Sequence, residues 1–240
     1  MTNHDVHQIA MRQLAIDLNC GVSDLQGPDT KVVISKPGPH YNFCKMICFR
    51  NTLVVSVDES LKAFIDSFVA DKIGFRCLEH VSLLTDEFRK YDKRVGIVEG
   101  YLPDMTANRE THPDFDVSVL WGDGTAALFD DKRYHCALGY RTTGPRADVI
   151  AVAGYRDGQI LGVAGASNDY ETMWQIGIDV LPEHRHSGVA TTLTNILTDE
   201  ILRKGIVPFC TIAWSNIASK NTAIDSGYKS AWATLGAGDE

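Results

Sequence analysis

The chain has 240 residues, of which 44% are hydrophobic and 22% charged, and a formal net charge of −8 from 23 basic and 31 acidic side chains. This length fits one large domain or two small ones, and the ordinary composition excludes a disordered, collagen-like or coiled-coil chain. The negative charge argues against nucleic acid or an anionic membrane as a partner. The sequence has no apolar run of about 18 residues and no N-terminal signal segment, so we expect a cytoplasmic protein.

Cysteine and histidine spacing gives no sign of a metal site. The one close cysteine pair, Cys44 and Cys48, has neither the spacing of a redox pair nor that of a zinc knuckle. The eight histidines form no HxxxH or HExxH pattern. We therefore expect buried, reduced thiols and no structural metal. The cysteines are Cys20, Cys44, Cys48, Cys77, Cys136 and Cys210.

Hydrophobic periodicity predicts the elements of the first part of the chain. In chain order they are a helix at 6–18, strands at 44–49 and 53–57, a helix at 61–69, a helix at 83–88 and a strand at 95–98. Gly21 is the expected end of the first helix, and Asp58 the expected N-cap of the second. Turn formers and two prolines between Leu102 and Phe115 then predict a boundary, which divides the chain into residues 1–110 and 111–240.

The second part has a clearer pattern. Val- and Ile-rich strands at 148–155 and 159–166 flank Asp157-Gly158, which predicts a hairpin. The elements that follow are a strand at 173–180, a helix at 189–204 that ends at Gly205, a strand at 208–213, a short helix at 217–225 and a last strand from Gly227 to about residue 234. The sequence thus predicts an antiparallel meander followed by alternating helices and strands.

The residues between strand 173–180 and the helix after it have the features of an anion site. The first turn of a helix leaves backbone N–H groups unpaired, and the helix dipole adds partial positive charge, so a pyrophosphate fits there. Gly188 permits close approach, Ala190 keeps the helix start narrow, and Arg185, His186 and Ser187 add donors. An ordinary helix start is the alternative. The segment lacks the glycine-rich motifs of nucleoside triphosphatases and dinucleotide-binding folds.

Two motifs carry a resemblance to a known family. Residues 178–193, IDVLPEHRHSGVATTL, resemble the acyl-CoA signature of the GNAT (GCN5-related) N-acetyltransferase superfamily, Q/R-x-x-G-x-G/A after a strand that ends in Val and a Pro. Asn216, followed by Gly227 and Tyr228, resembles the second motif, an Asn that opens a short helix ending in Gly-Phe or Gly-Tyr. The resemblance covers about residues 113–235. Residues 171–180, ETMWQIGIDV, make the chain similar to uncharacterised GNAT proteins of anaerobic Firmicutes.

The resemblance implies acetyl-CoA as the acyl donor, without a metal. Strand 173–180 is then expected to splay from strand 208–213, with the pantetheine in the gap and the pyrophosphate at the helix start. The residues implied to bind the cofactor are Ile178, Asp179, Val180, Arg185, His186, Ser187, Gly188, Val189, Ala190, Thr191, Asn216, Ser219 and Asn221. For Asn216 a helix N-cap is a second role, compatible with the first.

Catalytic groups are less clear, because two positions depart from the family pattern. Ala223 stands where many members have a Tyr that protonates the leaving thiolate, and Trp174 stands where some have a carboxylate base. Glu171 and Asp179 are the candidate bases and Tyr228 the candidate acid; a solvated loop, a polar surface and a packed strand aromatic are their respective alternatives. Direct attack by a positioned amine, with backbone donors polarising the thioester carbonyl, is also consistent.

We therefore predict an α/β protein of the GNAT fold, with a mixed, mostly antiparallel twisted sheet and a smaller N-terminal α/β part packed on it. The last strand needs a cover for its edge, from the N-terminal part or from a partner chain, as in a homodimer. The predicted function is transfer of an acetyl group from acetyl-CoA to a primary amine of a small molecule or peptide. A non-catalytic acyl-CoA-binding or sensing module is the alternative.

Overall fold

The computed structural model of the protein describes residues 1–239 except 71–75, 77–78, 141 and 145. The chain divides into two compact units, each assembled from separate segments. Unit 1 comprises Met1–Ile9, Tyr101–Thr211 and Asn216–Lys229, and unit 2 comprises Ala10–Gly100, Ile212–Ser215 and Ser230–Glu240. The division into functional domains 1–110 and 111–240 stays a prediction, since compactness alone assigns no role to either unit.

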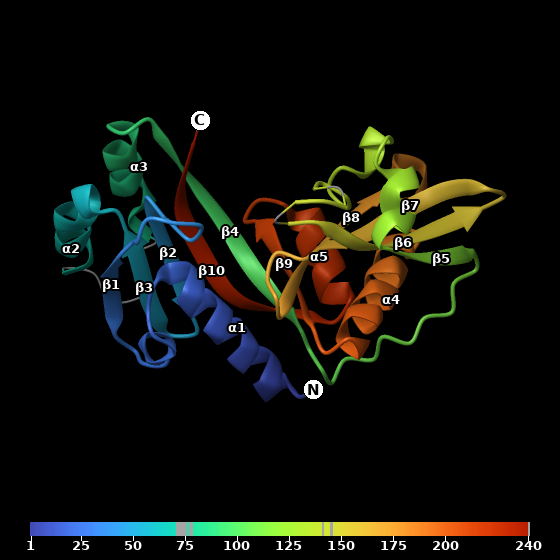
Figure 1. Cartoon of the computed structure of the whole chain (residues 1–240), viewed down its shortest axis with the longest axis horizontal. Coiled ribbons are helices and arrows are strands. Elements are labelled where there is room, and N and C mark those ends of the chain that lie inside the picture. Colours follow the sequence, from blue (N-terminus) through green and yellow to red (C-terminus); the bar gives the residue numbers. More distant parts are fainter. Residues whose placement is uncertain (71–75, 77–78, 141, 145, 240) are drawn as a thin grey trace. The chain divides into compact units, whose positions relative to one another are not determined.

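Unit 2 is a sheet with helices on both faces (Figure 1). Its elements are β1 (Thr30–Ile34), β2 (Cys44–Phe49), β3 (Thr52–Val57), α2 (Lys62–Ala70) and α3 (Val81–Arg89), with parts of α1 (Asn3–Leu18), β4 (Lys93–Pro103) and β10 (Tyr228–Asp239). The strand order is β1-β3-β2-β10-β4. β1 runs parallel to β3, and β2 is antiparallel to both β3 and β10. Apolar side chains of β2, β3, α2, α3 and β10 share one core.

The elements of unit 2 largely match the sequence predictions. The two strands and both later helices are confirmed, and the Asp58 side chain accepts a hydrogen bond from the Ser60 N–H as an N-cap does. Gly21 as the end of α1 was wrong. The helix ends at Leu18 because Asn19 adopts a left-handed φ of 59°, a conformation that Asn tolerates better than most residues.

The last strand is longer than predicted. β10 extends to Asp239, where the sequence suggested an end near residue 234. Residues 232–236 pair antiparallel with β2, so the N-terminal segment covers this edge, as expected. Close packing accompanies the pairing: a Cβ added at Gly100 on β4 would lie 1.9 Å from the Trp232 ring. This position therefore requires glycine.

Unit 1 is a five-stranded sheet between two layers (Figure 1). Its strands are β5 (Asp116–Trp121), β6 (Asp148–Arg156), β7 (Gln159–Ser167), β8 (Met173–Val180) and β9 (Val207–Ala213), in that spatial order. β5 to β8 are antiparallel neighbours, whereas β8 and β9 are parallel. α4 (Val189–Arg203) packs on β6, β7 and β8, and α5 (Ile217–Asp225) contacts α4. The predicted mixed, mostly antiparallel α/β fold is confirmed.

Short 3₁₀ helices pack against the sheet of unit 1 through a core separate from that of unit 2. They span Gly122–Leu128 and Lys132–Tyr134, and were not predicted. Their buried residues Leu128 and Tyr134 join Ala137 and Leu138 against side chains of β6 and β7. The predicted hairpin is confirmed, with φ of 52° at Asp157 and 76° at Gly158, the left-handed pair that a type I′ turn needs.

Asp104 ties the first residues of the chain to the rest of unit 1. Its carboxylate accepts hydrogen bonds from the Lys229 ammonium, the Asn3 amide and the Thr106 N–H and hydroxyl. These donors, the Lys229 ammonium foremost, hold the pKa of Asp104 well below its usual range. The Asn3 side chain also accepts from the Met105 N–H at 2.7 Å, which fixes the start of α1 in this unit.

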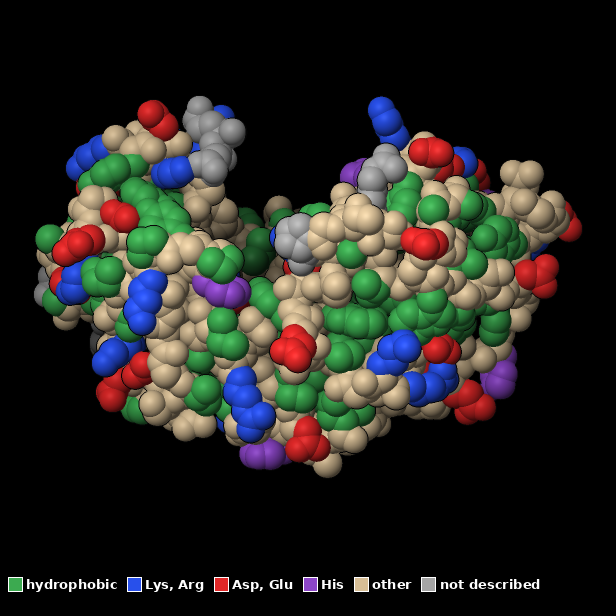
Figure 2. All heavy atoms as spheres, viewed as in Figure 1, with side chains coloured by type: hydrophobic (Ala, Val, Ile, Leu, Met, Phe, Trp, Pro, Cys, Tyr) green, Lys and Arg blue, Asp and Glu red, His purple; other side chains and the backbone are tan. Residues whose placement is uncertain are grey.

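The surface carries both acidic and basic side chains, as the composition indicates. On the face in Figure 2, acidic and basic side chains alternate over each unit rather than gathering by sign. Among the described residues, none of the helices combines the length and apolar character needed to span a bilayer.

Of the five described cysteines, Cys44 and Cys210 are buried, and burial raises the pKa of each thiol to about 12. Cys136 is exposed, so the expectation of buried thiols was wrong there, and Cys77 lies outside the described residues.

Candidate active site

The N-terminus of α4 is the candidate anion cradle. Gly188 is the N-cap residue with φ 80°, and it makes no side-chain cap; His186, two residues earlier, also has a left-handed φ of 60°. In this turn the Thr192 N–H donates to the Gly188 carbonyl, and the N–H groups of the first helical residues before it have no partner within the helix, which leaves them available to a ligand. A Cβ at Gly188 would meet nothing within 4 Å, which leaves space over these donors.

Two of the predicted side-chain donors already have partners inside the loop. The Ser187 hydroxyl donates to the His184 carbonyl at 2.6 Å, and the Arg185 Nε donates to the Val180 carbonyl at 3.3 Å. Both side chains are exposed and can exchange these bonds for others. The loop is therefore held in shape before any ligand arrives, and its backbone donors are the permanent part of the cradle.

The sheet opens between β8 and β9. Their parallel ladder covers only Met173 to Gln175, whereas the ladder of β8 with β7 continues to Val180. Backbone polar groups of successive strand residues point to opposite sides. The Thr172 carbonyl accepts from Val207 on the β9 side, and the Leu181 N–H donates to Leu161 on the β7 side. The backbone N–H and C=O groups of the even-numbered residues of β8 therefore point toward β9.

This alternation distinguishes the residues of β8 that can offer backbone groups to a cofactor from those that cannot. Ile176 and Ile178 direct their N–H and C=O groups toward the β9 side beyond the last described pair of that ladder, and Val180 directs its carbonyl there, toward Arg185. Asp179 directs its backbone toward β7, opposite Val163. The expected splay of the two strands is present, and Ile178 and Val180 line it with backbone groups while Asp179 does not.

The Asp179 side chain holds a loop against the sheet. Its carboxylate accepts the backbone N–H groups of Cys136 at 2.7 Å and Ala137 at 2.9 Å. The loop can approach because Gly177 has no side chain: a Cβ there would lie 1.9 Å from the Cys136 carbonyl oxygen. Asp179 thus has a structural task that competes with the predicted role of base.

The other two catalytic candidates, Glu171 and Tyr228, differ in burial. Glu171 is exposed in the turn before β8. Tyr228 is buried, its hydroxyl is 2.7 Å from the Thr198 hydroxyl, and desolvation raises its pKa. A buried hydroxyl with a partner fits the packing alternative for Tyr228 better than proton transfer. Neither position tests the catalytic assignment.

The residues of the second motif from Asn216 to Ala223 lie at the start of α5 and along it. The Asn216 side chain accepts from the Ser219 N–H at 3.1 Å, so Asn216 is the N-cap of α5, as the alternative reading proposed. Asn221 is exposed and Ala223 is buried. Trp174 packs edge-on against Trp121, with ring centroids 6.3 Å apart. Trp174 is thus part of an aromatic contact on the sheet.

A polar cluster at the closed end of the splay was not predicted. Arg146 pairs with Asp169 and lies 3.3 Å from the Gln175 side chain, which in turn bonds Thr211 of β9 at 3.4 Å. The Asp169 side chain is 5% exposed. The sequence offered no signal for this cluster, because its members come from separate segments. The cluster fixes the loop before β8 and therefore sets where Glu171 stands.

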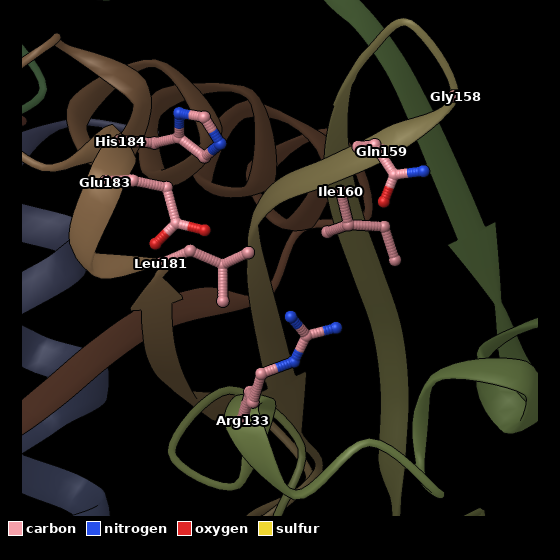
Figure 3. Close-up of a pocket in the computed structure, with 7 residues that line it drawn as sticks. All are labelled: Arg133, Gly158, Gln159, Ile160, Leu181, Glu183 and His184. Atoms are coloured by element: carbon pink, nitrogen blue, oxygen red, sulfur yellow. The ribbon is translucent and has the colours of Figure 1, made fainter.

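A pocket of about 350 Å³ lies beside the loop that connects β8 to the candidate cradle. Its lining comes from the hairpin, the first 3₁₀ turn after Asp131 and the loop after β8: Arg133, Gly158, Gln159, Ile160, Leu181, Glu183 and His184. Figure 3 shows the Arg133 guanidinium pointing into the space beside Leu181 and Ile160. Arg133 is also paired with Asp131. Because Glu183 also lines the pocket, its wall carries both signs of charge.

Comparison with known proteins identifies the class. Residues 107–225 match the model of the acetyltransferase (GNAT) family. This part of the chain thus matches the acetyltransferase domain of the GNAT family, whose members are acyl-CoA-dependent N-acyltransferases that use acetyl-CoA. The matched segment contains the cradle and the opening between β8 and β9. A search of the curated proteins finds no match.

Solved structures give looser likenesses. An acetyltransferase of the GNAT family from Colwellia psychrerythraea is 13% identical, with a TM-score of 0.48 and coverage of 76% of this chain and 75% of that one. A GCN5-related N-acetyltransferase-like protein from Streptococcus suis is 16% identical, with a TM-score of 0.47 and coverage of 77% and 71%. A Salmonella typhimurium protein, solved with its cofactor acetyl-CoA, is 15% identical, with a TM-score of 0.37 and coverage of 51% and 93%. The match covers 66% of the chain of the first structure found.

Proposed function

We propose that unit 1 transfers an acetyl group from acetyl-CoA to the primary amine of a small molecule or peptide. The carrying observation is the early end of the β8–β9 ladder, directly before an uncapped helix start. An extended amide chain can pair with strand groups in the opening, while a pyrophosphate accepts from the helix N–H groups. The two features adjoin at Val180, where β8 ends.

The proposed contacts divide along the cofactor. Ile178 and Val180 offer backbone partners to the pantetheine amides, and the N–H groups of the residues from His186 to Thr191 face the pyrophosphate. Asn216, Ser219 and Asn221 remain candidates for the far side of the opening, although the Asn216 oxygen already accepts the Ser219 N–H. For Asp179 we keep only the structural task, because its backbone faces β7 and its carboxylate faces the loop.

In the proposed reaction the amine nitrogen attacks the thioester carbonyl carbon. The C–N bond forms, the C–S bond breaks and the thiolate of CoA leaves. The amine proton passes to a base, for which Glu171 is the exposed carboxylate nearest the start of β8 in sequence, or to water, and the thiolate takes up a proton from solvent. Proximity and backbone polarisation of the carbonyl supply most of the rate when no dedicated acid is present.

A non-catalytic acyl-CoA-binding module is the second candidate, favoured by the buried Ala223 at the position of the family's Tyr and by the buried, partnered Tyr228. The narrower similarity to proteins of anaerobic Firmicutes gives no substrate, and it stays a prediction. A homodimer likewise stays a prediction.

Thiol release separates the two functions. The full chain is given acetyl-CoA with a panel of aliphatic amines, aminoglycosides and peptides with free N-termini, and free CoA is measured with a thiol reagent. Calorimetry with acetyl-CoA runs alongside. The enzyme predicts tight binding and amine-dependent release. Tight binding with release no faster than without amine, across the whole panel, supports the sensing module instead.

A further inference from the structure

Three potential metal ligands meet on the loop that Asp179 holds. His135, Cys136 and Asp179 each offer one ligand atom, and these atoms all lie within 4.8 Å of one another. The Cys136 Sγ and the His135 Nε2 are 3.4 Å apart. In a tetrahedral zinc site, bond lengths of about 2.3 Å to sulfur and 2.0 Å to nitrogen place those two ligands about 3.5 Å apart. The pair is therefore already at the spacing that zinc requires.

The His135 ring is oriented as a ligand ring usually is. Its Nδ1 lies 3.0 Å from the Lys132 carbonyl oxygen, which can only accept a hydrogen bond. The proton is therefore on Nδ1, and Nε2 carries the free lone pair. Metal-binding histidines almost always make this second contact, because it fixes the tautomer and the ring plane. Nε2 consequently faces Cys136 ready to coordinate.

The Asp179 carboxylate is held in the same manner. One of its oxygens, Oδ2, accepts two backbone N–H groups, from Cys136 and Ala137, so the side chain is fixed next to the residues it would share a metal with. The chain thus supports two of the three ligands with its own hydrogen bonds before any ion binds.

The three potential ligands are accessible from solvent. His135 and Cys136 are exposed and Asp179 is half-buried. An ion can enter from solvent, and a fourth coordination position stays open to water. Nitrogen, thiolate and carboxylate ligands together suit Zn²⁺ better than Mg²⁺ or Ca²⁺, which prefer oxygen alone.

We propose that His135, Cys136 and Asp179 form a Zn²⁺ site with three protein ligands and one open position. On binding, the Cys136 thiolate coordinates Zn²⁺ and the thiol proton goes to solvent. The site pins the 132–138 loop to β8 at Gly177. It is independent of the proposed acetyl transfer, and it differs from the sequence expectation because the ligands lie more than forty positions apart.

The test uses the full chain, stripped with a chelator and titrated with Co²⁺ as a spectroscopic substitute for Zn²⁺. A thiolate-to-cobalt charge-transfer band that saturates at one ion per chain, and that Zn²⁺ removes, is the expected result. Cys136→Ser should abolish the band, and His135→Gln should weaken Co²⁺ binding by about 100-fold or more. Cys20→Ser and His112→Gln remove the same residue types elsewhere and should leave the titration unchanged.

Asp179→Asn tests the third ligand with a side chain that still accepts both N–H groups. Its Zn²⁺ affinity should fall by about 10- to 100-fold while circular dichroism and the unfolding midpoint without metal stay close to those of the parent. A band that persists in Cys136→Ser overturns the proposal, as does the absence of any thiolate band in the parent chain. Binding that is equally weak in the parent and all variants also overturns it.

Discussion

Gly188 and Gly205 allow a controlled test of the pyrophosphate cradle. They flank the two ends of α4, have φ angles of 80° and 77°, and would each place a Cβ in open space. Valine at either position suffers the same left-handed strain, about 1–2 kcal/mol or somewhat more for a branched side chain. For a chain of this size that is a fall in Tm of about 2–8 °C. Thermal unfolding should therefore change alike in both variants.

Cofactor binding should separate them. Hydrogen bonds to a charged group contribute about 1.5–3 kcal/mol each, and the Gly188→Val side chain would stand over at least one of the free N–H groups. Its Kd for acetyl-CoA should rise by about 10- to 100-fold, whereas Gly205→Val should keep the parental Kd. Calorimetry with acetyl-CoA measures both. Equal affinities for Gly188→Val and the parent, with the variant folded, would refute a pyrophosphate site at this helix.

Three further outcomes are expected. Glu171→Gln should lower turnover and remove the acidic limb of the rate–pH profile while acetyl-CoA affinity stays the same; an unchanged profile would assign the base to water. Gly100→Ala forces a methyl group into an indole ring and should destabilise the fold by about 1–3 kcal/mol in chemical unfolding, whereas Gly96→Ala on the same strand, 3.9 Å from its nearest neighbour, should cost little. Because the folded pKa of Asp104 is depressed, its contribution to stability is present above the unfolded pKa of about 3.9 and is lost as the pH falls below it; Asp104→Asn should flatten this acid limb, and a limb as steep as the parent's would contradict the assignment.

Local sequence signals predicted the part of the site that one segment builds. The β6–β7 hairpin, the helix from Val189 and the glycine at its start all follow from periodicity, turn chemistry and capping. These features depend on neighbours in the chain, which a sequence displays directly. The splay of β8 from β9 came instead from the family resemblance.

Features that depend on tertiary contacts were missed. Arg146 meets Asp169 and Gln175, and Cys136 meets Asp179, only because the sheet brings separate segments together. No spacing rule connects such residues. β1 and β5 were also missed: both are edge strands of their units in which none of the positions is fully buried, and the alternation that marks a half-buried strand is weak in them.

The most direct test of acetyl transfer follows the acetyl group itself. Acetyl-CoA carrying a deuterated acetyl group is incubated with the full chain and a mixture of amines, and the amines are analysed by mass spectrometry. The account predicts that label appears on the nitrogen of at least one amine, and that Gly188→Val, at an acetyl-CoA concentration below its Kd, reduces the labelling while Gly205→Val does not. Bound acetyl-CoA with no label on any amine would contradict it.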